Sequence, residues 1–239
     1  MTAPSGAAGR EVDAAAGREV DAVLFDYGGV LTEPMRHSIE AWIADEGIDP
    51  ASFTATLKSW LGRDAAAGSP IHRLETGELP EAAFDAEFAA ALRTTSGAPV
   101  HPEGVLRRMF ARIQEDPAMW ELAEDLRAAG VPVAIVSNSW GGGNLYPRER
   151  LAALFAPVII SEEVGLRKPD PAIFTLALER LGVQPERAAF IDDATPNVDG
   201  AAALGIRAVH HTDPDTTRAA LADLVPALAR RTSPQKEFS

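Results

Sequence analysis

The sequence predicts an α/β protein: a Rossmann-like, doubly wound parallel sheet with an all-helical cap inserted after its first strand. Three observations support this prediction. Strand-like apolar runs alternate with helical patterns from residue 117 onward, an isolated apolar run occupies 20–26, and the stretch 33–116 has helical patterns only. Because a lone strand cannot bury both of its faces, 20–26 must join the later strands, which makes 33–116 an insertion.

The predicted cap is expected to consist of helices and loops. Apolar residues recur at helical spacing from position 35, and Gly47 is placed to end the first helix. Asp49 and Pro50 are the residue types of an N-cap and a first helical position, so they should begin a second helix. The pattern predicts helices over 35–47, 50–61, 80–92 and 102–113, and a loop over 63–70.

The second half of the chain alternates between strands and helices. Its strand-like runs are almost continuously apolar, which is typical of parallel strands covered on both faces. Asp170 and Pro171 are suited to cap a helix that Gly182 ends. The predicted elements are helix 117–129, strand 132–138, helix 147–154, strand 157–160, helix 171–182, strand 188–192, helix 197–204 and strand 206–210.

Four parts of the chain follow from this pattern. The sequence AAGREVDA occurs at 7–14 and again at 15–22, and only the second copy leads into a strand. We therefore expect a disordered N-terminal arm over 1–18. The core domain is predicted to comprise 19–32 and 117–231, the helical cap 33–116, and a flexible tail 232–239.

Composition argues against several classes of partner. The formal net charge of −13 disfavours nucleic acid, whose phosphate backbone requires a basic surface. No apolar run approaches the roughly 20 residues of a membrane helix, and the N-terminus lacks the apolar core of a signal peptide. The absence of cysteine excludes disulfides and thiolate metal sites. We expect a cytoplasmic protein, monomeric or homodimeric, with no membrane partner.

Polar side chains follow four of the predicted strands. In an open parallel sheet the carboxyl ends of the strands meet at one edge, where ligands bind. A carboxylate nucleophile, a cation and a carboxylate pair at that edge suit phosphoryl transfer, in which Mg²⁺ is held by oxygen ligands. The residues at these positions are Asp26, Ser137 with Asn138, Lys168, and Asp192 with Asp193.

Four segments of the sequence resemble the ordered motifs of the haloacid dehalogenase (HAD) superfamily. They are FDYGGVL, VSNSW, GLRKPDPAIF and FIDDATPNVDGAAALGI, and the resemblance covers roughly residues 20–215. The helical insertion resembles the small cap of that superfamily. Within it, the sequence is most similar to the N-terminal phosphatase domain of soluble epoxide hydrolase and to bacterial sugar-phosphate phosphatases.

The resemblance implies a Mg²⁺-dependent phosphomonoester hydrolase that acts on a small phosphorylated metabolite. Asp26 would be the nucleophile that becomes an aspartyl phosphate, and Lys168 would stabilise the charge on both groups. Ser137, with Asn138 beside it, would hydrogen-bond the phosphoryl group, and Asn197 would support the loop of the fourth motif.

The resemblance also implies a metal site. Its ligands would be Asp26, the backbone carbonyl of Gly28, and the pair Asp192 and Asp193. Within the pair, Asp193 would bind the metal directly, and Asp192 would act through a water or from outside the coordination shell.

Gly28 departs from the usual pattern of the superfamily. Most of its phosphatases have a second Asp here, which protonates the leaving group and is worth about 10²–10⁴ in rate. One interpretation is a phosphatase that uses leaving groups needing little protonation, or an acid from the cap such as His72 or Glu75. The alternatives are a 2-haloacid-dehalogenase-type hydrolase and a low-turnover phosphate-binding regulatory module. Dehalogenases usually lack the acid pair of the fourth motif, so Asp192 and Asp193 favour phosphate chemistry.

Overall fold

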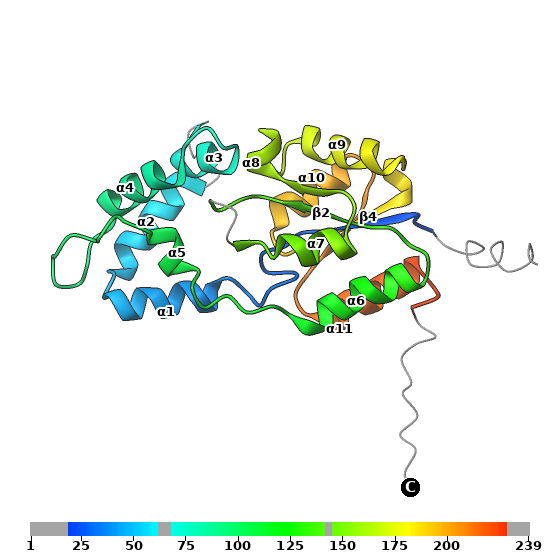
Figure 1. Cartoon of the computed structure of the whole chain (residues 1–239), viewed down its shortest axis with the longest axis horizontal. Helices are drawn as coiled ribbons and strands as arrows, with labels where there is room; N and C mark the ends of the chain where they lie inside the picture. The colour runs from blue at the N-terminus through cyan, green and yellow to red at the C-terminus, as the bar shows by residue number, and fades with distance from the viewer. Residues whose placement is uncertain (1–18, 62–67, 142–144, 229–239) are drawn as a thin grey trace, which may run out of the picture.

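The structure is a computed structural model and describes residues 19–61, 68–141 and 145–228. The predicted arm over 1–18, the predicted tail over 232–239 and most of the predicted loop over 63–70 lie outside the described residues. Figure 1 shows two parts side by side: a group of helices, and a sheet with helices on both of its faces. No described helix is long and apolar enough to cross a lipid bilayer.

The sheet confirms the predicted fold class. It has five strands in the order β3-β2-β1-β4-β5, and every neighbouring pair is parallel. The central strand β1 places its last residue, Phe25, opposite Ile135 on one side and Ile191 on the other, so the carboxyl ends of the three strands lie at the same edge of the sheet. The strands are β1 (Ala22–Phe25), β2 (Val133–Ser137), β3 (Val158–Ile160), β4 (Ala188–Asp192) and β5 (Arg207–His210).

Helices cover both faces of the sheet (Figure 1). One face packs against α6 (Pro117–Ala128), α7 (Arg148–Leu154) and α11 (Pro214–Leu224), and the other against α9 (Pro171–Leu181) and α10 (Thr195–Ala203). Because successive side chains of a strand point to opposite faces, Phe25 enters the first layer and Leu24 the second. Two short helices, α8 (Ser161–Val164) and η2 (Pro185–Arg187), lie at the strand ends.

The inserted segment contains helices and, among its described residues, no strand longer than an isolated bridge. It has its own aromatic core, in which the centroid of the Phe88 ring lies 5.5 Å from that of Phe84 and 6.4 Å from that of Trp42. The insertion therefore packs as a unit beside the sheet edge. Its helices are α1 (Arg36–Glu46), α2 (Pro50–Leu61), α3 (Pro70–Glu75), α4 (Glu81–Ala91) and α5 (Val105–Met109).

Most predicted helices have the expected ends. Asp49 accepts hydrogen bonds from the first turn of α2, and Asp170 caps α9 through the Ala172 amide at 2.9 Å. The predicted helix over 102–113 is wrong in length, because Gly104 has a left-handed φ of 67° and helix α5 begins only after it. Helices α3, α8 and α11 were not predicted; the first two are too short to show a periodic pattern.

Candidate active site

The turn after β1 presents Asp26 at the sheet edge. The backbone amide of Tyr27 donates to Asp26 Oδ1 at 2.7 Å, which fixes the orientation of the carboxylate. The amide of Gly29 donates to Thr32 Oγ1 at 2.8 Å and closes the turn. Within the described residues, no hydrogen bond or ion pair reaches Asp26 Oδ2, so this oxygen is available to a ligand.

The two glycines of this turn have different roles. Gly29 has a φ of 79°, and a Cβ atom there would lie 2.3 Å from Asp193 Oδ2. Only a residue without a side chain lets the Asp193 carboxylate approach the turn so closely. Gly28 has no positive φ, and a Cβ atom there would make an ordinary contact of 3.4 Å with Met35 Sδ. A methionine from the start of the insertion thus lies beside the position of the missing acid.

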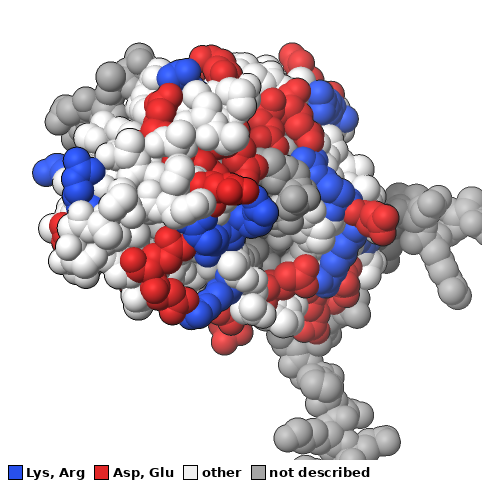
Figure 2. Space-filling view, turned by 60° about the vertical axis from the view of Figure 1, so that its left-hand side comes forward, with Lys and Arg blue, Asp and Glu red and all other residues white. Residues whose placement is uncertain are grey.

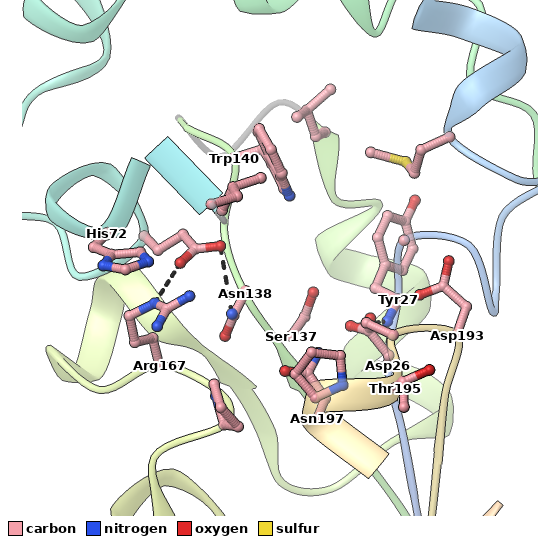
Figure 3. Close-up of a pocket in the computed structure, with 18 of the residues that line it drawn as sticks. Asp26, Tyr27, His72, Ser137, Asn138, Trp140, Arg167, Asp193, Thr195 and Asn197 are labelled. Carbon is pink, nitrogen blue, oxygen red and sulfur yellow. Dashed lines mark hydrogen bonds and ion pairs between the residues drawn. The ribbon is translucent and has the colours of Figure 1, made fainter. Parts of the chain in front are cut away.

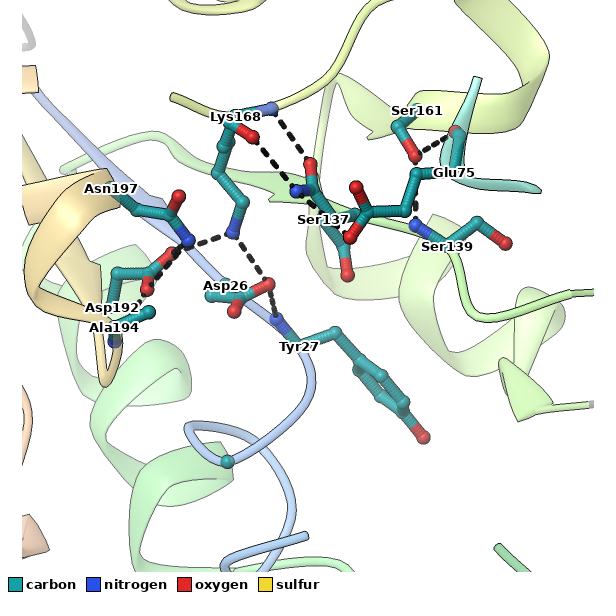
Figure 4. Close-up of polar contacts among 12 residues, drawn as sticks. Asp26, Tyr27, Glu75, Ser137, Ser139, Ser161, Lys168, Asp192, Ala194 and Asn197 are labelled. Atoms are coloured by element: carbon teal, nitrogen blue, oxygen red, sulfur yellow. Dashed lines mark hydrogen bonds and ion pairs between the residues drawn. The ribbon is translucent and has the colours of Figure 1, made fainter. Parts of the chain in front are cut away.

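Lys168 joins the ends of β1 and β4 (Figure 4). Its side chain is fully buried, and Nζ lies 2.8 Å from Asp26 Oδ1 and 2.6 Å from Asp192 Oδ2. A buried ammonium is stable only when it is paired and hydrogen-bonded. Lys168 therefore holds these two carboxylates together, as expected for a residue that neutralises charge at this edge.

The two acids of the fourth motif differ in their surroundings. Asp192 is buried, and its carboxylate accepts hydrogen bonds from the Ala194 amide at 2.8 Å and from Asn197 Nδ2 at 3.0 and 3.1 Å. The predicted supporting role of Asn197 is confirmed by these contacts. Asp193 instead lines the pocket above the site and is exposed to it. The Asp192 carboxylate is thus held by the protein, whereas Asp193 is open to the pocket.

Burial and repulsion between neighbouring carboxylates raise the pKa values of Asp26 and Asp193. Desolvation, opposed by Lys168 and reinforced by Asp192 and Asp193, raises the pKa of Asp26 to about 7. Desolvation and the charge of Asp192 raise the pKa of Asp193. Burial alone would lower the pKa of Lys168, but Asp192 and Asp26 outweigh it and raise this pKa. A cation at this site would relieve the repulsion between the acids.

The acid cluster fits a hard divalent cation. Asp26, Asp192 and Asp193 each offer an oxygen, and these atoms lie within 4.8 Å of one another. Carboxylate and carbonyl oxygens are the ligands that Mg²⁺ prefers. Gly28, whose carbonyl is a predicted ligand, belongs to the same pocket wall, and the Gly29 turn leaves room for Asp193.

Ser137 ends β2, Asn138 follows it, and both line the same pocket. Ser137 Oγ lies 3.1 Å from the hydroxyl of Tyr146, a buried residue that also lines the pocket. Asn138 was expected to bind the phosphoryl group, but its amide is bonded to the protein. Its Oδ1 accepts from the Lys168 amide at 2.8 Å, and its Nδ2 donates to the Lys168 carbonyl at 3.0 Å.

A pocket of about 850 Å³ lies over Asp26 (Figure 3). One of its walls is polar and contains His72, Glu75 and Arg167, with Glu75 Oε2 2.5 Å from Arg167 Nε. Burial and the charge of Arg167 lower the pKa of His72, which makes it a poor proton donor near neutral pH. The apolar part of the lining is formed by Met35, Leu61, Ile113, Trp140 and Leu145.

On the face of the molecule shown in Figure 2, Lys and Arg side chains alternate with Asp and Glu, so positive charge is not concentrated on that face. The formal net charge of the chain is −13. Attraction for an anionic ligand must therefore come from groups inside the site.

A family model described as haloacid dehalogenase-like hydrolase matches residues 20–205, which is most of the chain. The chain belongs to the haloacid dehalogenase-like hydrolases. The resemblance seen in its four motifs is thereby confirmed, and relatives of the chain are named as phosphatases.

Curated relatives of this HAD-like hydrolase include one much longer protein and several phosphatases. It is 31% identical over 202 residues to acyl-CoA dehydrogenase family member 10 of Mus musculus, covering 82% of this chain and 18% of the mouse protein. It is 36% identical over 132 residues to phosphoserine phosphatase of Thermus thermophilus, covering 51% of each chain. It is 27% identical over 195 residues to phosphorylated carbohydrates phosphatase of Thermotoga maritima, covering 79% and 83%. The chain thus spans about a fifth of the mouse relative and about half of the Thermus relative.

Solved structures share the fold of the HAD-like hydrolase. A HAD-like family hydrolase of Porphyromonas gingivalis matches with a TM-score of 0.61 and 21% identity, covering 89% of this chain and 97% of that one. A HAD family enzyme of Bacteroides thetaiotaomicron, in complex with magnesium and inorganic phosphate, matches with a TM-score of 0.57 and 21% identity, covering 81% and 94%. A dehalogenase matches with a TM-score of 0.58 and 21% identity, covering 82% and 88%. At such identities the likeness shows the fold alone.

The structure brings every predicted site residue of the HAD-like hydrolase to one edge of the sheet. The sequence reasoning missed three further side chains of the site: Tyr146, Arg167 and Met35. Arg167 precedes the predicted Lys168 and could have been noticed as a second cation in the same motif. Nothing in the local sequence indicated Tyr146 or Met35, because their positions depend on how the loop after β2 and the insertion pack.

The Gly29 turn generates a first prediction. Gly29→Ala should weaken Mg²⁺ binding by about 10–100-fold, because the new Cβ displaces the carboxylate of Asp193, a predicted metal ligand. Changes to residues that orient a metal ligand typically have an effect of this size. Gly28→Ala is the matched control and should change the affinity by less than about 3-fold, since its Cβ makes an ordinary contact. Calorimetric titration with Mg²⁺ measures both. Wild-type affinity in Gly29→Ala would contradict this account of the turn.

The raised pKa of Asp26 generates a prediction about pH. Its ordinary value is 3.8 and its folded value about 7, so the folded state binds this proton more tightly than the unfolded state. Without metal, the stability contributed by Asp26 is present below pH 3.8 and is lost as the pH rises through about 7. Bound Mg²⁺ requires the ionised carboxylate and should raise Tm more at about pH 8 than at about pH 5.5. Equal Mg²⁺-induced shifts in Tm at the two pH values would disagree with this linkage.

Proposed function

We propose that this HAD-like hydrolase is a Mg²⁺-dependent phosphomonoester hydrolase that acts on a small phosphorylated metabolite through an aspartyl-phosphate intermediate on Asp26. The observation that carries the proposal is the buried contact of Lys168 with both Asp26 and Asp192, beside an acid cluster suited to a divalent cation. The relatives named as phosphatases support the same reaction class.

In the proposed reaction an oxygen of Asp26 attacks phosphorus, and the bond from phosphorus to the alcohol oxygen breaks. The departing alkoxide takes a proton from solvent water. A second water then attacks the phosphorus of the aspartyl phosphate, gives up its proton to solvent, and the bond from phosphorus to the Asp26 oxygen breaks. Inorganic phosphate leaves, and the Asp26 carboxylate is regenerated. Asp26 Oδ2 is the candidate attacking oxygen, because Oδ1 is already bonded to Lys168 and to the Tyr27 amide.

The other site residues stabilise and orient the charges. The Lys168 ammonium neutralises the nucleophile, and the Ser137 hydroxyl, which lies 3.1 Å from the Tyr146 hydroxyl, is proposed to donate to a phosphoryl oxygen. Asp26, Gly28 and Asp193 would hold Mg²⁺ directly, with Asp192 behind them. When bound, the cation would offset the negative charge of the phosphoryl group.

The dehalogenase and regulatory alternatives have less support. Asp192 and Asp193 give the site a carboxylate pair that halide displacement does not require. A site used only to bind phosphate would have little need for an oriented nucleophile, yet Asp26 is fixed by the Tyr27 amide and by Lys168.

A direct test uses p-nitrophenyl phosphate with Mg²⁺. Asp26→Asn should lower kcat by more than about 10³-fold, because it removes the nucleophile, and excess EDTA should abolish wild-type turnover. Acid quenching during turnover should trap a phosphoryl group on Asp26 in the wild type only. Full activity of Asp26→Asn or in EDTA would refute the mechanism. Chloride release from 2-chloropropionate without phosphatase activity would favour the dehalogenase alternative.

Gly28 generates a prediction about the leaving group. Without an acid at this position, ethyl phosphate should be hydrolysed far more slowly than p-nitrophenyl phosphate, whose leaving group needs little protonation. Gly28→Asp should raise turnover of ethyl phosphate by up to about 10²-fold and raise that of p-nitrophenyl phosphate much less. The backbone at Gly28 accepts a side chain, although Met35 must move aside for a carboxylate. An unchanged ratio of the two rates would mean that another group supplies the proton.

A further inference from the structure

The helical cap touches the core beside the active site at the end of α3. Figure 1 shows α3 beside α8 of the core. The turn after α3 meets α8 so closely that a Cβ on Gly77, whose φ is 74°, would lie 2.8 Å from the Glu162 carbonyl oxygen. The Glu75 carbonyl accepts a hydrogen bond from Ser161 Oγ at 2.5 Å. This junction is therefore a specific contact between cap and core.

Glu75 is the cap residue that reaches through this junction. Its side chain is only 4% exposed, and both carboxylate oxygens accept hydrogen bonds from the core. Oε2 accepts from Arg167 Nε at 2.5 Å, and Oε1 lies 3.4 Å from Asn138 Nδ2. Because a carboxylate has acceptors on both oxygens, it satisfies two donors at once.

Asn138 links Glu75 to Lys168 through hydrogen bonds to both residues. Its Oδ1 accepts a hydrogen bond from the backbone N–H of Lys168 at 2.8 Å, and its Nδ2 donates to the backbone C=O of Lys168 at 3.0 Å. If the amide were turned over, its oxygen would face the Glu75 carboxylate and the Lys168 carbonyl, and both contacts would be repulsive. The charge of Glu75 thus favours the one orientation that fixes the Lys168 backbone.

We propose that Glu75 is a positioning residue: through Asn138 it holds Lys168 against Asp26 and Asp192, and it does so only while the cap is docked on the core. The inference rests on the proposed function, because it assigns Glu75 a part in that reaction. Both carboxylate oxygens of Glu75 act as acceptors, from Arg167 and from Asn138. Burial raises the pKa of this carboxyl, and the charge of Arg167 opposes that rise.

The exchange of Glu75 for its isostere tests the link. Glu75→Gln keeps the shape but turns an N–H toward either Arg167 or Asn138, so one donor meets another. With p-nitrophenyl phosphate and Mg²⁺, we expect kcat to fall by about 10-fold, the effect of losing one charge-assisted hydrogen bond, with little change in KM. Glu78→Gln, an exposed cap residue nearby, is the matched control and should leave kcat unchanged.

A double-mutant cycle separates positioning from a general structural effect. If Glu75 acts through Asn138, the double variant Glu75→Gln with Asn138→Ala should have the same kcat as Asn138→Ala alone. Effects that multiply, or a change in KM alone, would overturn the proposal.

A second readout does not depend on turnover. The Lys168 amide donates to Asn138 Oδ1, so its hydrogen exchange, measured by NMR, should be about 10-fold faster in Glu75→Gln and unchanged in Glu78→Gln. Gly77→Ala, which pushes the cap away without touching Glu75, should have the same effect. Gly97→Ala is its control, because Gly97 has a similar φ of 79° and no atom within 4 Å of its Cβ position.

These outcomes distinguish the two proposals. Wild-type protein without phosphatase activity, but with faster Lys168 exchange in Glu75→Gln and Gly77→Ala, would refute the proposed function and keep the link from cap to lysine. Unchanged Lys168 exchange in both variants would refute the link, whatever the turnover.

Discussion

The buried ammonium of Lys168 is the group on which the rest of the site depends. It has no access to water, so its charge must be balanced by Asp26 and Asp192, which follow two neighbouring strands. Those strands are level because β1 and β4 pair in parallel register. The same contact opposes the repulsion between carboxylates that burial would otherwise make severe. The Lys168 side chain therefore depends on the register of β1 and β4, balances the charge of both carboxylates, and contributes to the candidate chemistry.

The turn after β1 leaves part of this charged site open to a ligand. Gly29 lets the Asp193 carboxylate approach the backbone, and the Tyr27 amide occupies one oxygen of Asp26 while leaving the other available. Gly28 removes an acid side chain and brings Met35 beside the vacant position. The result is a site with a nucleophile, charge neutralisation and metal ligands, but with an apolar group where a proton donor would stand.

The insertion contributes more than a cover over this edge. It supplies Met35 and Glu75 to the pocket, from its first residues and from the end of α3. Its aromatic core makes it a packed body, so the position of Glu75 follows the docking of the whole cap. Two contacts between α3 and the core, at Gly77 and at the Glu75 carbonyl, lie next to the chain of contacts that ends at Lys168.

The sequence alone determined the sheet, the capped helices and the set of strand-end residues, because apolar periodicity and the chemistry of Asp, Lys and Gly are local properties. Four ordered motifs were enough to indicate the family that the comparison confirms. Only the tertiary structure decided which groups hold the Asp192 carboxylate, why Gly29 must be glycine, and that Asn138 hydrogen-bonds Lys168. It also decided which cap residues enter the pocket. These features depend on contacts between segments far apart in the chain, such as Glu75 with Arg167, and no local pattern encodes such a distance.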